Sequence, residues 1–436
     1  MRSTSKTLSS SSGRGISWIQ EPYRLLFPLG ILCGVQGIGH WFFYGLGWIP
    51  SYSSHLHASI QSQAYMLCFI AGFLMTAMPR MSGARPASLI ETGGMVLGLV
   101  LMLGFLYAGQ WAAAEGTYAA LLLWVLRFAA VRRPARAADR PPVSPPAEFL
   151  WVPCVLLMGL AGTGLLAAAR ANALPAALMT TGKLLVQQGF LLGIVLGVGG
   201  FLGPRLMGTF QVVKHDEAAP HRARQKKLTA LAGAAFLFLS FWIEGAGWIR
   251  AGGGLRALVT LAVLIQTRSL VFRPVSTDPF VRYLWLSFWL VAAGTLLPAF
   301  FSAYRLPLMH LTFLGGYSLM TFAVATMVIL SHAGQASLLK KPWLPLEFTA
   351  AGILAAMAVR VASVFFPAAY FPLLALASGL WVVSALSWLA AVFPYLFRGA
   401  EAAELERLHE EAKQRILKQM ERSSGCGPQT GCSPAR

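Results

Sequence analysis

Histidine is the residue type whose positions in this sequence best suggest chemistry. Five of the eight histidines lie in or beside long apolar segments: His40, His55, His57, His310 and His332. A neutral imidazole in an apolar helical bundle is a usual axial ligand of haem and a good ligand of copper. The competing interpretation is structural, because a histidine can also hydrogen-bond to a neighbouring helix or lie at the membrane interface. The depth of each histidine in its segment helps to separate these interpretations.

The depths of these histidines follow from the helical rise. If the first apolar segment runs outward, His40 lies about two-thirds of the way across the bilayer, and the second and tenth segments run inward from His57 and His310. His310 and His332 are 22 residues apart, so they share a helix face but lie about 33 Å apart along the axis. We therefore predict an outer site from His40, His57 and His310, with His55 just outside it and His332 as a separate candidate at the inner end.

The elements that must position these histidines are membrane-spanning helices. The chain has 436 residues, 56% of them hydrophobic and only 12% charged, which excludes an ordinary cytosolic enzyme. Apolar runs of about 20 residues, the length that crosses a bilayer, recur along nearly the whole chain. The sequence predicts an all-α polytopic membrane protein with twelve spans, near 24–48, 57–79, 87–108, 111–131, 149–170, 180–203, 228–249, 255–272, 282–301, 307–331, 343–365 and 372–397.

The basic residues predict the orientation of these spans. The side that holds both chain ends has 20 Lys and Arg before the C-terminal tail is counted, whereas the opposite loops have four: Arg170, Arg250, Arg256 and Arg305. Cytoplasmic loops carry the excess of Lys and Arg, so both termini are expected in the cytoplasm. The formal net charge of +19 is then explained by topology. The lipid bilayer is the expected partner, and nucleic acid is not, because no soluble basic domain or base-stacking aromatic array is present.

Composition divides the chain into seven parts. Residues 1–21 are polar and Ser-rich and are expected to form a flexible tail, and 132–148 is a Pro- and Arg-rich linker. The basic 204–227 loop separates six spans from six, and 398–436 predicts a short amphipathic helix followed by a tail that contains Cys426 and Cys432. The membrane parts between them are 22–131 with spans 1–4, 149–203 with spans 5–6, and 228–397 with spans 7–12.

Four segments resemble the NnrS family of bacterial multi-spanning membrane proteins. They are EPYRLLFPLG at 21–30, HASIQSQAYMLCFIAGFLMTAMPRMSG at 57–83, GVGGFLGPRLMGTF at 197–210 and LPLMHLTFLGGYSLMTFAVATMVILSHAGQ at 306–335. His57 matches the first His of the family's His-x-His-Glu-Met element, while Ser59 and Ile60 replace the second His and the Glu. His310 and His332 match histidines of the family's tenth span, and Arg24 matches an arginine near the start of the first span, although Leu25 follows it where the family has proline.

The resemblance implies an inner-membrane protein of bacteria that contains haem and copper and takes part in the response to nitric oxide or in denitrification. It suggests His57, His310, His40 and His332 as cofactor-binding residues, and His57, His310 and His55 as metal ligands. Because the second His and the Glu are replaced, three outcomes stay open: a member that keeps haem and loses copper, one that recruits His40 or His55, and one that keeps only the fold.

Two other functions remain as alternatives. A secondary transporter of a small molecule would also have many spans and broken helices near the midplane, but few charges lie deep enough to couple ions. A respiratory oxidase or reductase core resembling the haem–copper oxidases would need an adjacent His-His pair, which this sequence lacks. The sequence contains no recognisable catalytic constellation, so it does not identify an enzyme.

Overall fold

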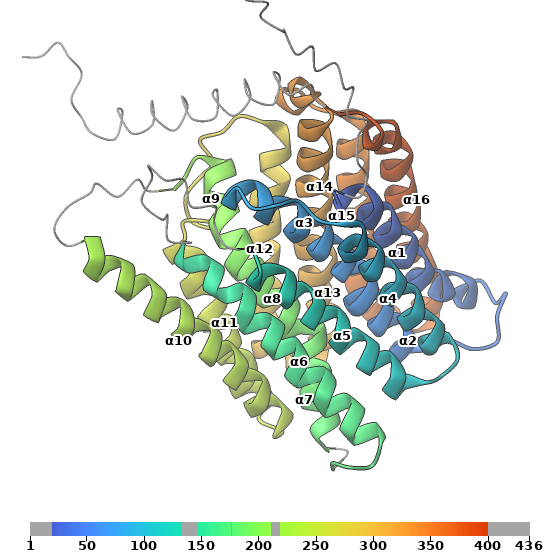
Figure 1. Cartoon of the computed structure of the whole chain (residues 1–436). Helices are drawn as coiled ribbons and strands as arrows, with labels where there is room; N and C mark the ends of the chain where they lie inside the picture. Colours follow the sequence, from blue (N-terminus) through green and yellow to red (C-terminus); the bar gives the residue numbers. More distant parts are fainter. Residues whose placement is uncertain (1–19, 133–145, 176, 211–218, 400–436) are drawn as a thin grey trace, which may run out of the picture.

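The computed structural model describes residues 20–132, 146–175, 177–210 and 219–399, and every regular element in these ranges is a helix. Twelve helical segments are long and apolar enough to cross a membrane, which confirms the predicted number (Figure 1). The predictions for residues 1–19, for most of the 132–148 linker, for 211–218 and for the amphipathic helix and cysteine tail after residue 399 lie outside the described residues.

Each span is built from one or more helices. Span 1 is α1 (Tyr23–Gly45), and span 2 consists of α2 (Ser54–Ser59), η1 (Ile60–Tyr65) and α3 (Met66–Ser82). Span 3 is α4 (Leu89–Tyr107), span 4 is α5 (Trp111–Ala130), and span 5 consists of η2 (Ala147–Leu150) and α6 (Trp151–Arg170). Span 6 consists of α7 (Ala177–Leu184), η3 (Leu185–Gly189), α8 (Phe190–Ile194), η4 (Val195–Gly199) and α9 (Gly200–Met207). Spans 7, 8 and 9 are single helices: α10 (Ala219–Gly245), α11 (Ile249–Gln266) and α12 (Pro279–Phe300). Span 10 consists of η5 (Ser302–Tyr304), α13 (Arg305–His310), η6 (Leu311–Ser318) and α14 (Leu319–His332), and η7 (Ala336–Lys340) follows it. Span 11 consists of α15 (Leu344–Ala362) and η8 (Ser363–Phe365), and span 12 consists of η9 (Pro367–Ala369) and α16 (Tyr370–Leu396).

Span 8 differs from its predicted boundaries at both ends, because it runs from Ile249 to Gln266 instead of 255–272. Sequence reasoning counted Arg256 with the loop residues, and an isolated charge inside a bilayer is costly. In the structure Arg256 lies within α11 and is only 6% exposed, because Glu244 of α10 pairs with it. A partner on a neighbouring helix therefore moves the boundary by about two turns.

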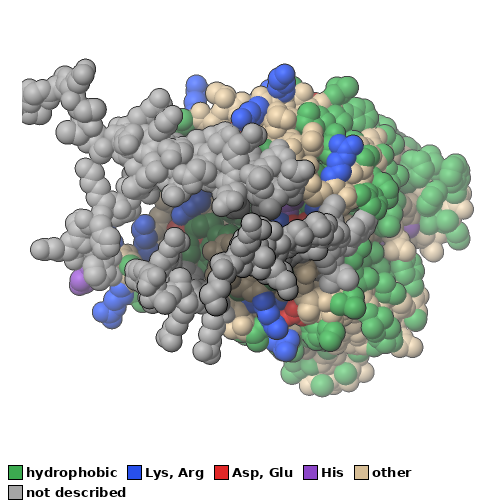
Figure 2. Space-filling model, turned by 45° about the horizontal axis from the view of Figure 1, so that its top comes forward, with side chains coloured by type: hydrophobic (Ala, Val, Ile, Leu, Met, Phe, Trp, Pro, Cys, Tyr) green, Lys and Arg blue, Asp and Glu red, His purple; other side chains and the backbone are tan. Residues whose placement is uncertain are grey.

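The outer helices are apolar all round, as a helix between protein and lipid must be. In α4, the buried residues Met95, Leu99 and Met102 recur at steps of three or four, while Leu97 on another face is 60% exposed. Figure 2 looks toward the end of the bundle near both termini of the described chain and shows Lys and Arg side chains there, with hydrophobic side chains covering the flank. The polar end and the apolar flank are what a membrane-embedded bundle requires.

Three spans lie inside the bundle. Each span contacts the next one along the chain, and the bundle closes where α16 packs on α1. The apolar stretches of spans 2, 6 and 10 are 67, 83 and 72% buried, whereas those of the other spans are 28–50% buried. The inner spans are therefore four apart in the chain.

Within the described residues, π-helical turns occur only in the inner spans, as η1 in span 2, η3 and η4 in span 6, and η6 in span 10. The inner spans contact one another in pairs at or near these π-helical turns. The η1 segment packs on η3, the hydroxyl groups of Tyr65 and Ser318 lie 3.4 Å apart, and the Gln188 amide lies 3.9 Å from the Met309 sulfur. Because π-turns change the facing of side chains and are frequent at functional sites, this meeting point directs the search for a site.

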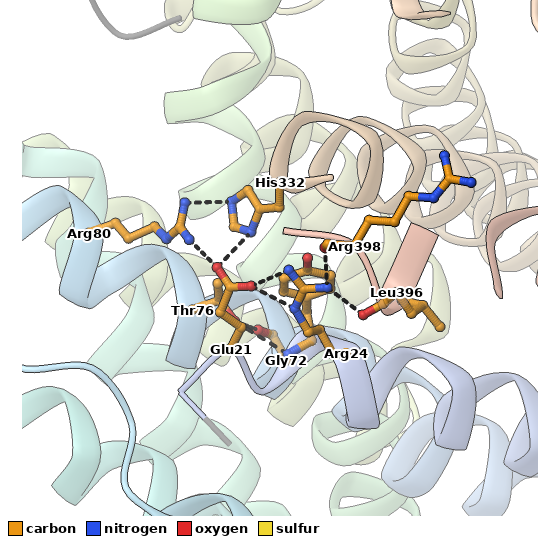
Figure 3. Close-up of polar contacts among 9 residues, drawn as sticks. Glu21, Arg24, Gly72, Thr76, Arg80, His332, Leu396 and Arg398 are labelled. Carbon is orange, nitrogen blue, oxygen red and sulfur yellow. Dashed lines mark hydrogen bonds and ion pairs between the residues drawn. The ribbon is translucent and has the colours of Figure 1, made fainter. Parts of the chain in front are cut away.

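A polar cluster holds four spans together at the end of the bundle near both chain ends (Figure 3). Glu21, just before α1, accepts a hydrogen bond from Arg24 Nε at 2.6 Å and pairs with Arg80 of α3. The Arg80 Nη1 atom lies 3.1 Å from Nε2 of His332 at the end of α14. Arg24 also donates to two backbone carbonyls at the end of span 12, those of Leu396 and Arg398. We call Glu21, Arg24, Arg80 and His332 the chain-end cluster.

Glu21 carries the negative charge of the chain-end cluster and lies outside α1. Burial opposes its ionisation, but His332 together with the charges of Arg24 and Arg80 outweighs burial and lowers the pKa of Glu21 from 4.5 to about 2. A carboxyl group whose pKa is lower in the folded state stabilises the fold above its unfolded pKa. That contribution is lost as the pH falls through the folded pKa.

We predict that Glu21→Gln lowers the free energy of unfolding of the purified chain at about pH 7 by on the order of 3 kcal/mol. The difference between wild type and variant should shrink as the pH falls from about 5 toward 2, because Glu21 becomes protonated in both folded and unfolded wild type. Thermal unfolding in detergent at a series of pH values measures this difference.

Glu347→Gln is the matched control for this experiment. Glu347 pairs with Arg282 at 2.9 Å, but the Arg282 side chain is 62% exposed, so loss of the pair should cost less than about 1 kcal/mol. Equal destabilisation by the two substitutions, or a Glu21→Gln effect that does not change with pH, would contradict the assigned role of Glu21.

Candidate functional site

His57 is held in place by the backbone of α1. The α2 helix begins after Ser53, whose side chain accepts a hydrogen bond from Leu56 N, and Nδ1 of His57 lies 2.8 Å from the Gly37 carbonyl oxygen. One helical turn later, Gln61 donates to the Gly34 carbonyl at 2.8 Å. A carbonyl can only accept from Nδ1–H, so Nε2 of His57 is left as the unprotonated ring nitrogen, free to act as a ligand.

Glycine permits this close approach of spans 1 and 2. A Cβ atom on Gly37 would lie 2.7 Å from the Gln61 amide nitrogen, which is closer than real Cβ contacts allow. Small residues let helix backbones approach in a membrane. The Gly37 carbonyl therefore reaches the His57 ring because position 37 has no side chain.

His40 lies beside His57. Their ring centroids are 6.1 Å apart and the rings are nearly perpendicular, and Trp41 stands 5.9 Å from His57. In the part of the chain that the structure describes, Nε2 of His40 is a buried atom with no hydrogen-bond partner. A buried ring nitrogen without a partner is costly, which makes this region more than a set of satisfied core histidines.

His310 ends α13, immediately before the π-helix η6. Its Nδ1 lies 2.8 Å from the Leu306 carbonyl oxygen, so its Nε2 is also free to act as a ligand. His310 and His57 lie within electrostatic range of each other, and Arg360 of α15 lies within range of both. The structure thus places His40 beside His57, and His310 lies within electrostatic range of His57.

His55 faces a different part of the bundle. It is two residues before His57, and two residues on a helix correspond to a rotation of about 200°. Its ring centroid lies 4.5 Å from that of Trp111, and its Nε2 contacts Arg170. A ring nitrogen that faces a guanidinium group is poorly placed to bind a cation.

His332 and Arg24 belong to the chain-end cluster instead of the histidine site. His332 lies at the opposite end of span 10 from His310, as the 22-residue spacing predicted, and its Nδ1 is 3.4 Å from a carboxylate oxygen of Glu21. The Arg24 side chain is almost fully buried between Glu21 and the carbonyls that end α16. These contacts give both residues a role in joining helices.

The donor set suits a group that needs one or two imidazoles. Across the described residues, no three His, Cys, Asp or Glu side chains are grouped so that they could hold a metal ion. His57 and His310 each keep one ring nitrogen free, come from two inner spans, and have a nearby cation in Arg360. The histidine site therefore offers two imidazole nitrogens and one cationic side chain to a bound group.

Sequence reasoning missed Arg360 and Gly37 as parts of this site. Arg360 lies near the end of its helix, where a long basic side chain ordinarily reaches the lipid headgroups. Gly37 could have been found from its position one turn before His40, where a small residue indicates a close helix contact. Which helix it contacts is not recorded in the sequence.

Comparison with known proteins identifies the family of this chain. A family model described as NnrS protein matches residues 17–399, and no curated protein matches the chain. The matched range includes all twelve spans, the histidine site and the chain-end cluster. Because the match extends over nearly the whole sequence, this chain belongs to the NnrS family, which makes it a multi-spanning membrane protein related to the nitric oxide response at the level of the family.

Proposed function

We propose that this protein binds haem through His57 and His310 and uses it in the response to nitric oxide. The observation that carries the proposal is that both histidines point Nδ1 at a backbone carbonyl and keep Nε2 free. A second interaction that fixes the tautomer and ring orientation is typical of metal-ligating histidines. Family membership supports the connection to nitric oxide.

Each residue of the site has a separate task. His57 and His310 would hold the haem iron, and the carbonyls of Gly37 and Leu306 would keep the two rings in the ligating tautomer. Arg360 would pair with the haem carboxylates. When bound, the haem would supply electron-transfer chemistry, and a diatomic ligand such as nitric oxide would have to replace one of the two imidazoles at the iron. The apolar bundle contributes by excluding water, which tunes this chemistry.

Copper stays a prediction that rests on the resemblance to the family. Ser59 and Ile60 stand where the family has its second histidine and glutamate. Ser59 is buried at the end of α2, and it offers no imidazole. His40, with its unpartnered Nε2 beside His57, is the residue best placed to replace the missing ligand.

The haem proposal predicts that His57→Ala and His310→Ala each reduce haem occupancy by about tenfold or more, or shift the spectrum of the bound haem, because each removes a direct ligand. The measurement is the Soret absorbance per protein after expression with added haem, together with the spectral change on addition of nitric oxide. His221→Ala and His55→Gln are the controls, because His221 is exposed on α10 and His55 faces Arg170.

Two results would count against the haem proposal. The absence of a Soret band in wild-type protein, despite adequate haem, would exclude haem as the cofactor. A normal haem spectrum in both His57→Ala and His310→Ala would show that these residues are not the ligands, although haem still binds.

We also propose that the end of the bundle near both chain termini faces the cytoplasm of a bacterial inner membrane. The 20-to-4 distribution of Lys and Arg in the sequence supports this orientation, and twelve spans place both ends of the chain on one side. A green fluorescent protein inserted in the 132–148 linker should fluoresce, and alkaline phosphatase inserted at 171–175 should be active. Phosphatase activity in the linker, with none at 171–175, would reverse the orientation.

A further inference from the structure

A separate cavity lies among spans 6 to 10, and the proposed haem function does not use it. It is lined by polar side chains from α10, α11, α13, η3 and η6, notably Gln188, Glu244, Arg256, Arg305, Thr312 and Tyr317. The Met309 side chain also lines the cavity and precedes His310 in the chain. The cavity is therefore at the same end of the bundle as the histidine site.

The charges that line the cavity do not balance. Glu244 pairs with both Arg256 and Arg305, so two guanidinium groups face one carboxylate. Among the described lining residues, no other side chain carries a charge at neutral pH. The Glu244 and Arg256 side chains are 2% and 8% exposed, and that of Arg305, toward the surface, is 35% exposed. An excess of one positive charge in a membrane-embedded cavity is unfavourable unless an anion approaches it.

Two buried hydrogen-bond donors in the cavity have no partner. Within the described part of the protein, Nε of Arg256 and the Thr312 hydroxyl are both without one. The other guanidinium nitrogens of Arg256 are used, because Nη1 donates to the Gln188 carbonyl oxygen at 2.6 Å and Nη2 pairs with Glu244. A buried donor left unpaired costs about 1–3 kcal/mol, so a hydrogen-bond acceptor bound at either atom would recover part of this free energy.

The local helix geometry explains why the Thr312 hydroxyl is free. In ordinary α-helical turns of this protein, threonine donates to the carbonyl four residues earlier, as Thr260 does to Arg256 at 2.8 Å. Thr312 lies at the start of the π-helix η6, where the backbone register changes, and it makes no such bond. The same π-turn that marks the centre of the bundle therefore leaves this hydroxyl group available to a ligand.

The size of the cavity limits the ligand. About 20 Å³ is open to the centres of water-sized molecules, which is roughly the space of one or two waters. An anion as large as gluconate does not fit in this space, whereas a halide or a bent anion of three heavy atoms such as nitrite does. Such an anion accepts hydrogen bonds from several donors and carries the single negative charge that the lining lacks.

We propose that this cavity is a binding site for one small inorganic monovalent anion, held by Arg256 Nε and the Thr312 hydroxyl and attracted by the excess charge of Arg305. Glu244 and Gln188 accept hydrogen bonds from the two Nη atoms of Arg256 and so hold its guanidinium group in place. The positive charge attracts the anion, and the small volume excludes larger ones.

Direct binding to the full-length purified protein tests this site. Radioactive chloride in a scintillation proximity assay should bind saturably, with nitrite as a competitor and gluconate without effect. A saturable rise in the unfolding temperature with chloride or nitrite at constant ionic strength is the second readout, because a ligand that binds only the folded state stabilises it.

Thr312→Val keeps the shape of the side chain and should weaken anion binding by about tenfold, since it removes a hydrogen bond to a charged group. Arg305→Gln should weaken binding by a similar factor because it removes the excess charge, while Glu244 keeps its buried partner Arg256. Arg250→Gln is the matched control, because Arg250 is an exposed arginine on the same helix, α11, and does not line the cavity.

The outcomes are distinct. Saturable binding that is weakened by Thr312→Val or Arg305→Gln and kept in Arg250→Gln supports the anion site. No saturable response of the wild type to chloride or nitrite overturns it and leaves a water-filled cavity. Equal affinity in the wild type and in a folded Thr312→Val variant also overturns it. The Soret absorbance of the same samples reports separately on the haem proposal.

Discussion

The bilayer offers no water to polar groups, and this constraint organises the structure. Three glutamates buried in the spans each pair with an arginine: Glu91 with Arg132, Glu115 with Arg170, and Glu244 with Arg256. Each pair joins helices that are close in the bundle, and two of the carboxylates receive further hydrogen bonds from neighbouring spans. Because an unpaired charge is expensive in this environment, each pair fixes how its helices sit against each other.

Because the bilayer offers no water, polar atoms without a hydrogen-bond partner indicate where a ligand could bind. The buried Nε2 of His40, Nε of Arg256 and the Thr312 hydroxyl are among the buried polar atoms of the described residues that have no partner. Thr312 lies in the π-helix η6, Arg256 bonds to Gln188 of the π-helix η3, and His40 lies beside His57 of span 2. A π-turn changes which residues face inward and which carbonyls are free. The inner spans therefore gain both the meeting points of the bundle and the polar atoms that a ligand would use.

Much of the architecture could be predicted from the sequence because apolar runs and basic loops have physical causes that act locally. Twelve spans were expected and twelve are present. The boundary of span 8 was wrong because Arg256 has a partner on α10, and pairing across helices leaves no local signal. Arg132 was expected in a loop facing water, yet it is 7% exposed against Glu91 for the same reason.

Within the histidine site, residue types and depths were predictable and ring directions were not. Helical rise placed His40, His57 and His310 at one depth and separated His332 from them. The opposite facing of His55 and His57 also follows from helical rotation. Sequence could not reveal that Gly37 turns His57 toward α1, or that Glu21 and Arg80 surround His332, since these contacts join residues far apart in the chain.

The sequence by itself determined the membrane class, the number of spans and the distribution of basic loops, because hydrophobicity and charge act along the chain. Only the tertiary structure decided which spans lie inside, which histidine nitrogens are free, and which arginines are buried. These properties depend on packing between helices, where a glycine, a π-turn or a single carboxylate changes what each side chain meets.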